Sequence, residues 1–479
     1  MGFSQIKKKY FGDRRFYRMV LAVAVPMMVQ NGITTFVGLL DNIMVGQTTP
    51  EQMNGVAIVN QLLFVFNLCI FGGLSGAGIF TAQYFGHGDR EGVRDTFRFK
   101  IWLALAITGV AVTVFLLAGE PLIRLYLSNE ADDPMRIEDT LRYGQDYLRV
   151  MLLGLPAFAA VQIYTSTLRE CSETMLPMKA GIVAVLVNLV FNWLLIFGKL
   201  FFPPMGVTGA AVATVISRFV EAAIVISWTH THRERCPWIE KMYRTLRVPA
   251  EKVRMIFAKG VPLLANEALW SVGQALLVQC YSVRGLDVVN GLNISSTISN
   301  LFMIIFTTLG SSVAIIVGQL LGAGKLKEAK DTDTKMIVFS ILCSVGTGLV
   351  MFLVCPVFPQ LYNTNEVARA AAVSLMRVSA CCMPFHAFMN AAYFTLRSGG
   401  KTWITFLFDS GFVWAVSIPI ALILSRFTDL SAPWMMALVS AGELIKCAAG
   451  YIMVKRNTWI HNMVSGEAGI QKKEANETV

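Results

Sequence analysis

The sequence predicts an all-α polytopic membrane protein: about twelve transmembrane helices arranged as two parallel six-helix repeats around a central cavity. Three observations lead to this prediction. Only 15% of the 479 residues are charged and 55% are hydrophobic, whereas soluble domains carry roughly 25% charged residues. Apolar runs of about 20 residues, long enough to span a bilayer, recur along the whole chain. The second half also repeats residues of the first half in the same order.

The apolar runs are separated by short polar loops. Helices are the expected structure, because backbone groups in hydrocarbon must bond within their own segment. Several runs exceed the minimal length, which predicts tilt or helix extending beyond the bilayer. The runs cover residues 17–45, 55–84, 98–118, 141–168, 175–198, 206–228, 254–283, 288–320, 334–356, 369–396, 402–425 and 432–454.

Basic residues gather in alternate loops, and these set the expected orientation. The segment before the first run is basic from Lys7 to Arg18, and the loop at 230–253 is the most basic of all. Loops rich in Lys and Arg stay in the cytoplasm, so both termini are expected inside. The N-terminus lacks a signal-peptide cleavage pattern, so the first run is expected to be a retained helix. A prokaryotic plasma (inner) membrane fits these features.

The internal repeat is visible residue by residue. Each repeat has an even number of spans, so both insert the same way up, and such transporters hold substrate between halves that rock. The predicted parts are a basic N-terminus (1–16), an N-lobe (17–229), a basic linker (230–253), a C-lobe (254–455) and a polar tail (456–479). The matched residues are Arg18, Met19 and Pro26 with Arg254, Met255 and Pro262; Gln83, Gly86, Gly88 and Asp95 with Gln319, Gly322, Gly324 and Asp331; and Arg169 with Arg397.

Several function classes are disfavoured by the sequence. The net charge of +10 is spread over short loops, and no RNP, zinc-finger or helix-turn-helix pattern indicates nucleic-acid binding. The nine cysteines form no CxxC pair, and His230 and His232 beside Cys236 match no common metal-ligand spacing. No HExxH, GxSxG or Walker motif is present, so neither an enzyme nor a resident cofactor is expected.

Four motifs, in order along the twelve spans, carry a family resemblance. They are VGLLDNIMVGQ in the first run; AQYFGHGD and GQLLGAGK at the ends of the second and eighth; LRECSETMLPM with its partner LRSGGKTW; and NLVFNWLLIFG followed by GVTGAAVATVISR. Over residues 17 to 455 the chain resembles the multidrug and toxic compound extrusion (MATE) family of cation-coupled exporters. Lipid-linked sugar flippases share this architecture, so the fold is better supported than the substrate.

Asp41 is the first candidate site residue, because a carboxylate in a membrane helix is expensive and is a functional candidate by default. The resemblance implies that Asp41 binds the coupling ion, either a proton or Na+. Asn188 and Asn192 share one helix face and match the family's neighbours of this acid, although the family pattern has Asp where this chain has Asn192. Thr214 matches a family hydroxyl position. Plain interhelical hydrogen bonding is the alternative for the asparagines.

Glu267 is the second candidate, and it matches a seventh-helix acid that forms a C-lobe cation site in one branch of the family. That branch has a further acid in the tenth helix, where this chain offers only His386 and Asn390. Asp409 lies in the eleventh run, and we expect it to snorkel or to pair. Arg218 with Glu221, and Glu443 with Lys446, are spaced three apart and are expected to neutralise each other.

Soft and aromatic side chains are expected to line the central cavity, since such surfaces accept varied organic cations. Ordinary packing or lipid contact is the alternative for most of them. Pro26 and Pro262 are expected to kink the first and seventh helices. The cavity candidates are Met27, Phe36, Phe64, Trp270, Met303, His386 and Asn390.

The function implied is a secondary antiporter that exports amphipathic or cationic organic compounds in exchange for Na+ or H+. A lipid-linked saccharide or lipid flippase is the alternative, disfavoured because the apolar runs contain few cations for a pyrophosphate. A receptor or channel fits the two-copy architecture poorly. A monomer in the bilayer is expected. Na+ and H+ remain alternatives, as do one or two ion-binding lobes.

Overall fold

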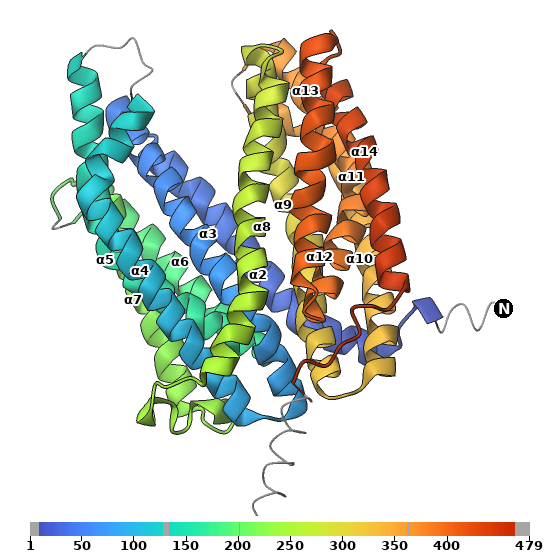
Figure 1. Cartoon of the computed structure of the whole chain (residues 1–479). Helices are drawn as coiled ribbons and strands as arrows, with labels where there is room; N and C mark the ends of the chain where they lie inside the picture. Colours follow the sequence, from blue (N-terminus) through green and yellow to red (C-terminus); the bar gives the residue numbers. More distant parts are fainter. Residues whose placement is uncertain (1–8, 128–133, 201, 363, 465–479) are drawn as a thin grey trace, which may run out of the picture. The chain divides into compact units, whose positions relative to one another are not determined.

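The computed structural model describes residues 9–127, 134–200, 202–362 and 364–464. All regular secondary structure in these ranges is helical. The twelve predicted spans are confirmed, because the described residues contain twelve helices long and apolar enough to cross a membrane. Figure 1 shows their order along the chain. Residues 1–8 of the predicted basic N-terminus and residues 465–479 of the predicted tail lie outside these ranges.

The first repeat consists of six long helices. Its third helix is longer at both ends than the predicted run 98–118, since it begins at Arg90 and continues to Leu127. The helices are α2 (Arg14–Val45), α3 (Pro50–His87), α4 (Arg90–Leu127), α5 (Pro134–Glu170), α6 (Met175–Phe197) and α7 (Gly206–Thr231).

The second repeat has the same order, with one difference. Its fifth span is interrupted by two π-helical segments, which the sequence analysis did not predict. The elements are α8 (Ala250–Ser282), α9 (Leu286–Gly322), α10 (Leu326–Val354), α11 (Glu366–Ser398), the interrupted span α12 (Thr402–Phe406), η4 (Leu407–Gly411), η5 (Val413–Ser417) and α13 (Ile418–Phe427), and α14 (Ala432–Lys455).

The chain forms two compact units, which are not identical with the two repeats. Unit 2 contains Val29–Gly78 and Arg90–Arg254, and unit 1 contains Met1–Met28, Ile79–Asp89 and Met255–Val479. The division between residues 254 and 255 lies one residue after the expected start of the C-lobe at 254. Two short pieces of the first repeat, the start of α2 and the end of α3, therefore pack with the second repeat.

The core of unit 1 shows how the start of α2 is held. Val20 and Ala24 of α2 are fully buried, in one cluster with Leu309 and Val313 of α9 and Leu396 of α11. Helices α9, α10 and α11 lie side by side. Lipid tails are as apolar as these side chains, so close van der Waals packing in this shared cluster holds the N-terminal half of α2 within unit 1.

Repeat-related glycines bring the ends of α3 and α9 into direct backbone contact. A Cβ added to Gly86 would overlap the carbonyl oxygen of Gln319, and a Cβ added to Gly322 would overlap that of Gln83. Each helix then ends at a glycine with positive φ, Gly88 at +81° and Gly324 at +73°, a conformation that favours glycine. The matching motifs AQYFGHG and GQLLGAG thus form a reciprocal helix crossing.

The segment after α14 is packed and not a free tail. The Gln83 side chain, fully buried, donates to the backbone oxygens of Ser398 and His461, at 3.0 and 3.3 Å, and accepts from Met463 N at 2.8 Å. Trp459 is only 1% exposed. Residues 456–464 therefore belong to the fold of unit 1, although we predicted the polar tail to begin at 456.

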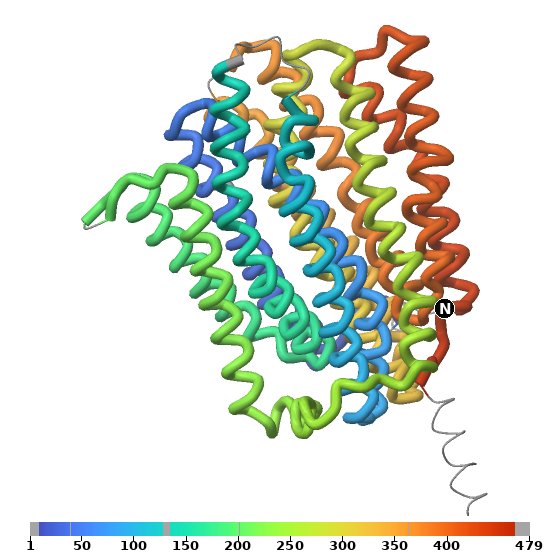
Figure 2. The backbone as a smooth tube through the Cα atoms, turned by 60° about the vertical axis from the view of Figure 1, so that its left-hand side comes forward, coloured from blue at the N-terminus to red at the C-terminus, as the bar shows by residue number. Residues whose placement is uncertain are grey.

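Unit 2 includes the predicted basic linker between α7 and α8. Figure 2 shows this linker as a light-green stretch at the bottom. Trp238 and Met242 of this linker are buried. Arg98 of α4 donates to the Met242 oxygen at 3.2 Å and bonds to Asp95 at 3.0 Å, while Lys252 reaches Asp95 at 3.1 Å. The linker is thus anchored to α4 and does not hang free.

Candidate functional site

The first candidate site lies within unit 2, where α2, α6 and α7 meet. Asn192 donates through Nδ2 to Asp41 Oδ1 at 2.6 Å and to Asn188 Oδ1 at 3.2 Å. Asn188 Nδ2 lies 3.3 Å from the Thr214 hydroxyl. The structure thus brings together the four residues that sequence reasoning grouped around the first acid: Asp41, Asn188, Asn192 and Thr214. We call them the first-repeat site.

The amides of the first-repeat site can supply two donors to Asp41. When the Asn188 amide is turned over, its nitrogen lies 3.0 and 3.1 Å from the two Asp41 oxygens, and its oxygen accepts from Thr214 at 3.3 Å. The hydrogen-bond network decides between such orientations, and this one serves both the carboxylate and the hydroxyl. Asn188 and Asn192 are 5% and 2% exposed, so their bonds to Asp41 are shielded from water.

One acceptor in the first-repeat site is unused. Asn192 Oδ1 is buried and has no hydrogen-bond partner among the described residues. A buried polar atom without a partner is destabilising. A bound cation would give this oxygen a partner. A proton on Asp41 would do so only after the Asn192 amide turned over, because that amide presents its nitrogen to Asp41.

Charges near the first-repeat site are already paired. Arg218 of α7 is within electrostatic range of Asp41 and bonds to Glu221 at 2.8 Å, as predicted. Tyr147 of α5, buried, is also within range of Asp41 and contacts Asn60 Oδ1 at 3.4 Å. Asp41 therefore faces amides and hydroxyls, while the nearest guanidinium is bound to another acid.

The second candidate acid, Glu267, is half-buried on α8 in unit 1. It lies within electrostatic range of Arg397 and Asp409. Its chain neighbour Asn266, 1% exposed, donates to Asp409 Oδ2 at 3.1 Å and to the Tyr393 hydroxyl at 3.4 Å. Glu267 is thus part of a larger polar group that the sequence analysis did not assemble.

Asp409 is the centre of that group. It bonds to Lys446 of α14 at 2.8 Å, with side-chain exposures of 20% for Asp409 and 10% for Lys446. Ser410 donates through N and Oγ to Asn266 Oδ1, at 3.2 and 2.7 Å. We call Asn266, Tyr393, Asp409, Ser410 and Lys446 the second-repeat network. The expectation that Asp409 pairs is confirmed.

The expectation that Glu443 and Lys446 neutralise each other is wrong. Lys446 turns to Asp409, and Glu443 instead meets His386 Nε2 at 3.0 Å. Residues three apart on a helix share a face, but each here has a better partner on a neighbouring helix. An acid therefore does face the tenth span, although α14 supplies it.

The predicted cavity residues occupy varied environments. Met27 is buried in the unit 1 core, and Met303 packs against a cluster of α9, α10 and α11. Asn390 of α11 packs against Gly310 of α9 and has a buried Oδ1 without a partner among the described residues. The remaining aromatic candidates are exposed: Phe36, Phe64 and Trp270. The roles of these cavity candidates stay predictions. The kinks also stay predictions, since α2 and α8 are continuous helices that contain Pro26 and Pro262.

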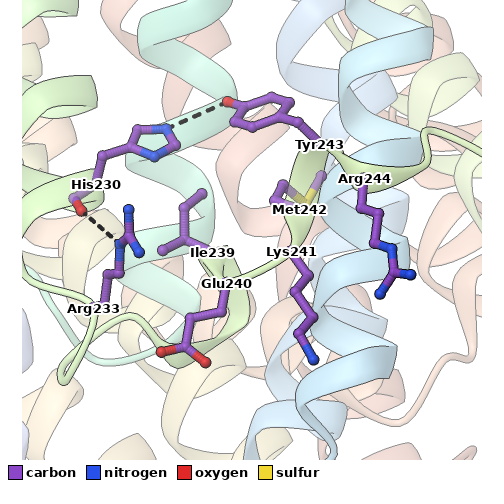
Figure 3. Close-up of a pocket in the computed structure, with 8 residues that line it drawn as sticks. All are labelled: His230, Arg233, Ile239, Glu240, Lys241, Met242, Tyr243 and Arg244. Carbon is purple, nitrogen blue, oxygen red and sulfur yellow. Dashed lines mark hydrogen bonds between the residues drawn. The ribbon is translucent and has the colours of Figure 1, made fainter.

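A separate pocket of about 410 Å3 lies in the basic linker, lined by His230, Arg233, Ile239, Glu240, Lys241, Met242, Tyr243 and Arg244 (Figure 3). His230 contacts the hydroxyls of Tyr164 and Tyr243, at 3.1 and 3.4 Å. Nearby Cys236 is buried, and burial together with Glu173 raises the pKa of its thiol to about 12. Cys236 is thus a protonated thiol at neutral pH, and thiols bind metals as thiolates.

Similarity to known proteins identifies the family of this chain. The sequence model of the MatE family matches residues 26–194 and 262–423, once in each repeat. The chain belongs to the MatE family. It is 26% identical over 420 residues to the probable multidrug resistance protein NorM of Thermotoga maritima, with 86% of each chain covered. It is 26% identical over 423 residues to the multidrug resistance protein MdtK of Pectobacterium atrosepticum, covering 87% of this chain and 89% of that one.

A solved MatE-type structure has the same fold. The MATE transporter VcmN of Vibrio cholerae superposes with a TM-score of 0.83, at 15% identity, over 93% of this chain and 98% of that one. At this identity the likeness concerns the fold alone. Together with the family match, it shows a multi-pass membrane protein with the MatE fold.

Proposed function

We propose that this MatE-family protein is a secondary antiporter that exports amphipathic organic cations in exchange for Na+ or H+. The observation that carries the proposal is the first-repeat site: an intramembrane carboxylate held by amide donors beside an unpartnered, buried amide oxygen. Such an acid marks an ion or proton pathway by default. The relatives' names, multidrug resistance proteins, support an organic substrate.

The proposed cycle uses Asp41 as the group that carries the coupling ion. With Na+, the ligands would be Asp41, the Asn192 oxygen and the Thr214 hydroxyl. With H+, the proton would reside on Asp41, and the Asn192 amide would turn over to accept from it. Either species neutralises the carboxylate. Coupling then requires that the ion and the exported compound prefer different facing states. The two parallel repeats supply the halves that alternate.

Paired cations argue against the flippase alternative. A pyrophosphate would need unpaired cations in the apolar runs, but Arg218, Lys446 and Lys100 each bond to a carboxylate, at 2.8, 2.8 and 2.6 Å. Acids therefore neutralise these intramembrane cations. A cationic or neutral substrate is the better match. The basic N-terminus and linker would face the cytoplasm of the plasma membrane.

Reconstituted vesicles test the proposal. Efflux of a fluorescent organic cation would be measured under an imposed Na+ gradient, and separately under an imposed pH gradient. One gradient should drive efflux, and Asp41→Asn should reduce it to the level of vesicles without protein. Asp139→Asn, at an exposed acid of α5, is the matched control and should leave the rate unchanged.

Two results would contradict the proposal. If the rate of dye efflux did not change with either gradient, the protein would not be an antiporter. A rate equal to wild type in Asp41→Asn would remove the role of the first-repeat site, and Glu267→Gln would then show whether coupling belongs to the second repeat.

A further inference from the structure

The second-repeat network is a built ion pair inside membrane-spanning helices. The Lys446 ammonium lies 2.8 Å from Asp409 Oδ1, while Asp409 Oδ2 accepts from Asn266 at 3.1 Å. The same ammonium lies 5.2 and 6.0 Å from the ring centres of Phe408 and Phe412. One carboxylate and two aromatic rings thus surround a single amine, which is the set of groups that recognises an organic cation.

The backbone at Asp409 is unusual. Asp409 lies within the π-helical segment η4, and η5 follows after a single residue. π-Helical turns are rare and are frequent at functional sites, because the wider turn re-aims side chains. Ser410 is bonded to Asn266, and Trp414 Nε1 donates to the Leu269 oxygen at 3.0 Å. The interrupted span is therefore fastened to α8, the helix that carries Glu267.

A buried pair of this kind is poor evidence for a purely structural role. Apolar residues of similar volume often replace a buried ion pair without loss of stability. Charged groups in membrane spans are expensive and tend to mark function. Asp409 keeps a 20% exposed side chain, so a ligand can reach it. Unit 2 offers a contrast, since Lys100 is fully buried against Glu170 and bonds also to Ser166 and Thr167.

We propose that Asp409, with the rings of Phe408 and Phe412, is a subsite for the exported organic cation, and that Lys446 is a tethered competitor for it. This inference rests on the proposed export of cations. In the empty site the Lys446 ammonium neutralises Asp409, so that no unpaired carboxylate is left in the membrane. An arriving cation displaces Lys446 from Asp409. When the cation leaves, Lys446 returns, which weakens binding and favours release.

Equilibrium binding to the purified full-length protein tests this assignment. The probe is tetraphenylphosphonium, a permanent organic cation, with neutral triphenylphosphine oxide of similar shape for comparison. Lys446→Met removes the competitor, so tetraphenylphosphonium should bind about tenfold tighter, which corresponds to about 1.4 kcal/mol. The double variant Asp409→Asn/Lys446→Met removes the subsite and should bind it about tenfold more weakly than wild type. Triphenylphosphine oxide should bind all forms equally.

The double variant decides the question even if Lys446→Met does not fold, because it leaves no unpaired charge. Lys100→Met/Glu170→Gln, at the other buried pair, is the matched control and should keep wild-type affinity. The proposal is overturned if the Asp409/Lys446 double variant melts like wild type and binds tetraphenylphosphonium with unchanged affinity, since Asp409 would then make no contact with the bound cation. A wild-type protein that binds no organic cation would instead overturn the proposed function itself.

Discussion

The two repeats hold their acids in opposite ways. In the first-repeat site, Asp41 bonds to the neutral amide of Asn192, and a buried amide oxygen is left without a partner among the described residues. In the second-repeat network, Asp409 already carries the Lys446 ammonium. An acid among amides is ready for a free ion, whereas an acid with a built-in cation exchanges one cation for another. A duplicated fold therefore need not duplicate its chemistry.

Crossed variants should separate these two roles, and this is the largest effect expected. Asp41→Asn should abolish the response of dye efflux to the ion gradient but keep wild-type binding of tetraphenylphosphonium. The Asp409→Asn/Lys446→Met double variant should show the reverse: weaker binding, with residual efflux that still follows the gradient. If each variant lost both gradient-driven efflux and tetraphenylphosphonium binding, the two repeats would not have separate roles.

The buried Lys100–Glu170 pair of the first repeat should stabilise the fold itself. Lys100→Met leaves Glu170 without its ammonium and should lower the free energy of unfolding by roughly 3–5 kcal/mol, because an uncompensated charge stays buried. Thermal unfolding of the purified protein would measure this. Adding Glu170→Gln should recover most of the loss. A single variant as stable as wild type would show that water reaches Glu170.

At the crossing of α3 and α9, both repeats place a glycine, Gly86 or Gly322, against the backbone of the other helix. Gly86→Ala and Gly322→Ala each force a Cβ against the partner's backbone carbonyl. Each should lower the free energy of unfolding by about 1–3 kcal/mol, the usual cost of overpacking. Gly109→Ala and Gly346→Ala have nothing within 4 Å of the new Cβ and serve as controls. Unequal losses at Gly86 and Gly322 would argue against a reciprocal crossing.

Replacement of the repeat-related glutamines Gln83 and Gln319 should give the smallest expected effect, a local difference in hydrogen–deuterium exchange. Gln83→Leu removes all three hydrogen bonds of that side chain, of which those with His461 and Met463 hold residues 459–464, and each such bond is worth about 0.5–1.5 kcal/mol. Hydrogen–deuterium exchange should therefore rise in a peptide that covers residues 459–464. Gln319→Leu should leave that peptide unchanged. Equal protection in both variants would mean that other contacts hold the segment, such as buried Trp459 and the bond from Asn462 to the Gly322 oxygen.

The family resemblance grouped Asp41 with Asn188, Asn192 and Thr214, and the structure brings these side chains together. Helical spacing alone indicated only that Asn188 and Asn192 share one face of their helix. The prediction failed for Lys446, because Glu443 on the same helix and Asp409 on the eleventh span are both acids, and spacing along one helix does not choose between them. The interrupted eleventh span left no sequence signal that we recognised, since π-helical turns have the same composition as the helices around them.

By itself, the sequence determined the number and approximate positions of the spans, the duplication, and which acids lie in the apolar runs, because hydropathy and spacing act locally. Only the tertiary structure decided which cation meets which acid, and that the end of α3 packs with the second repeat. Those choices depend on how neighbouring helices are rotated and how closely their backbones approach. Asp409 is paired with Lys446 because α14 turns that side chain toward η4.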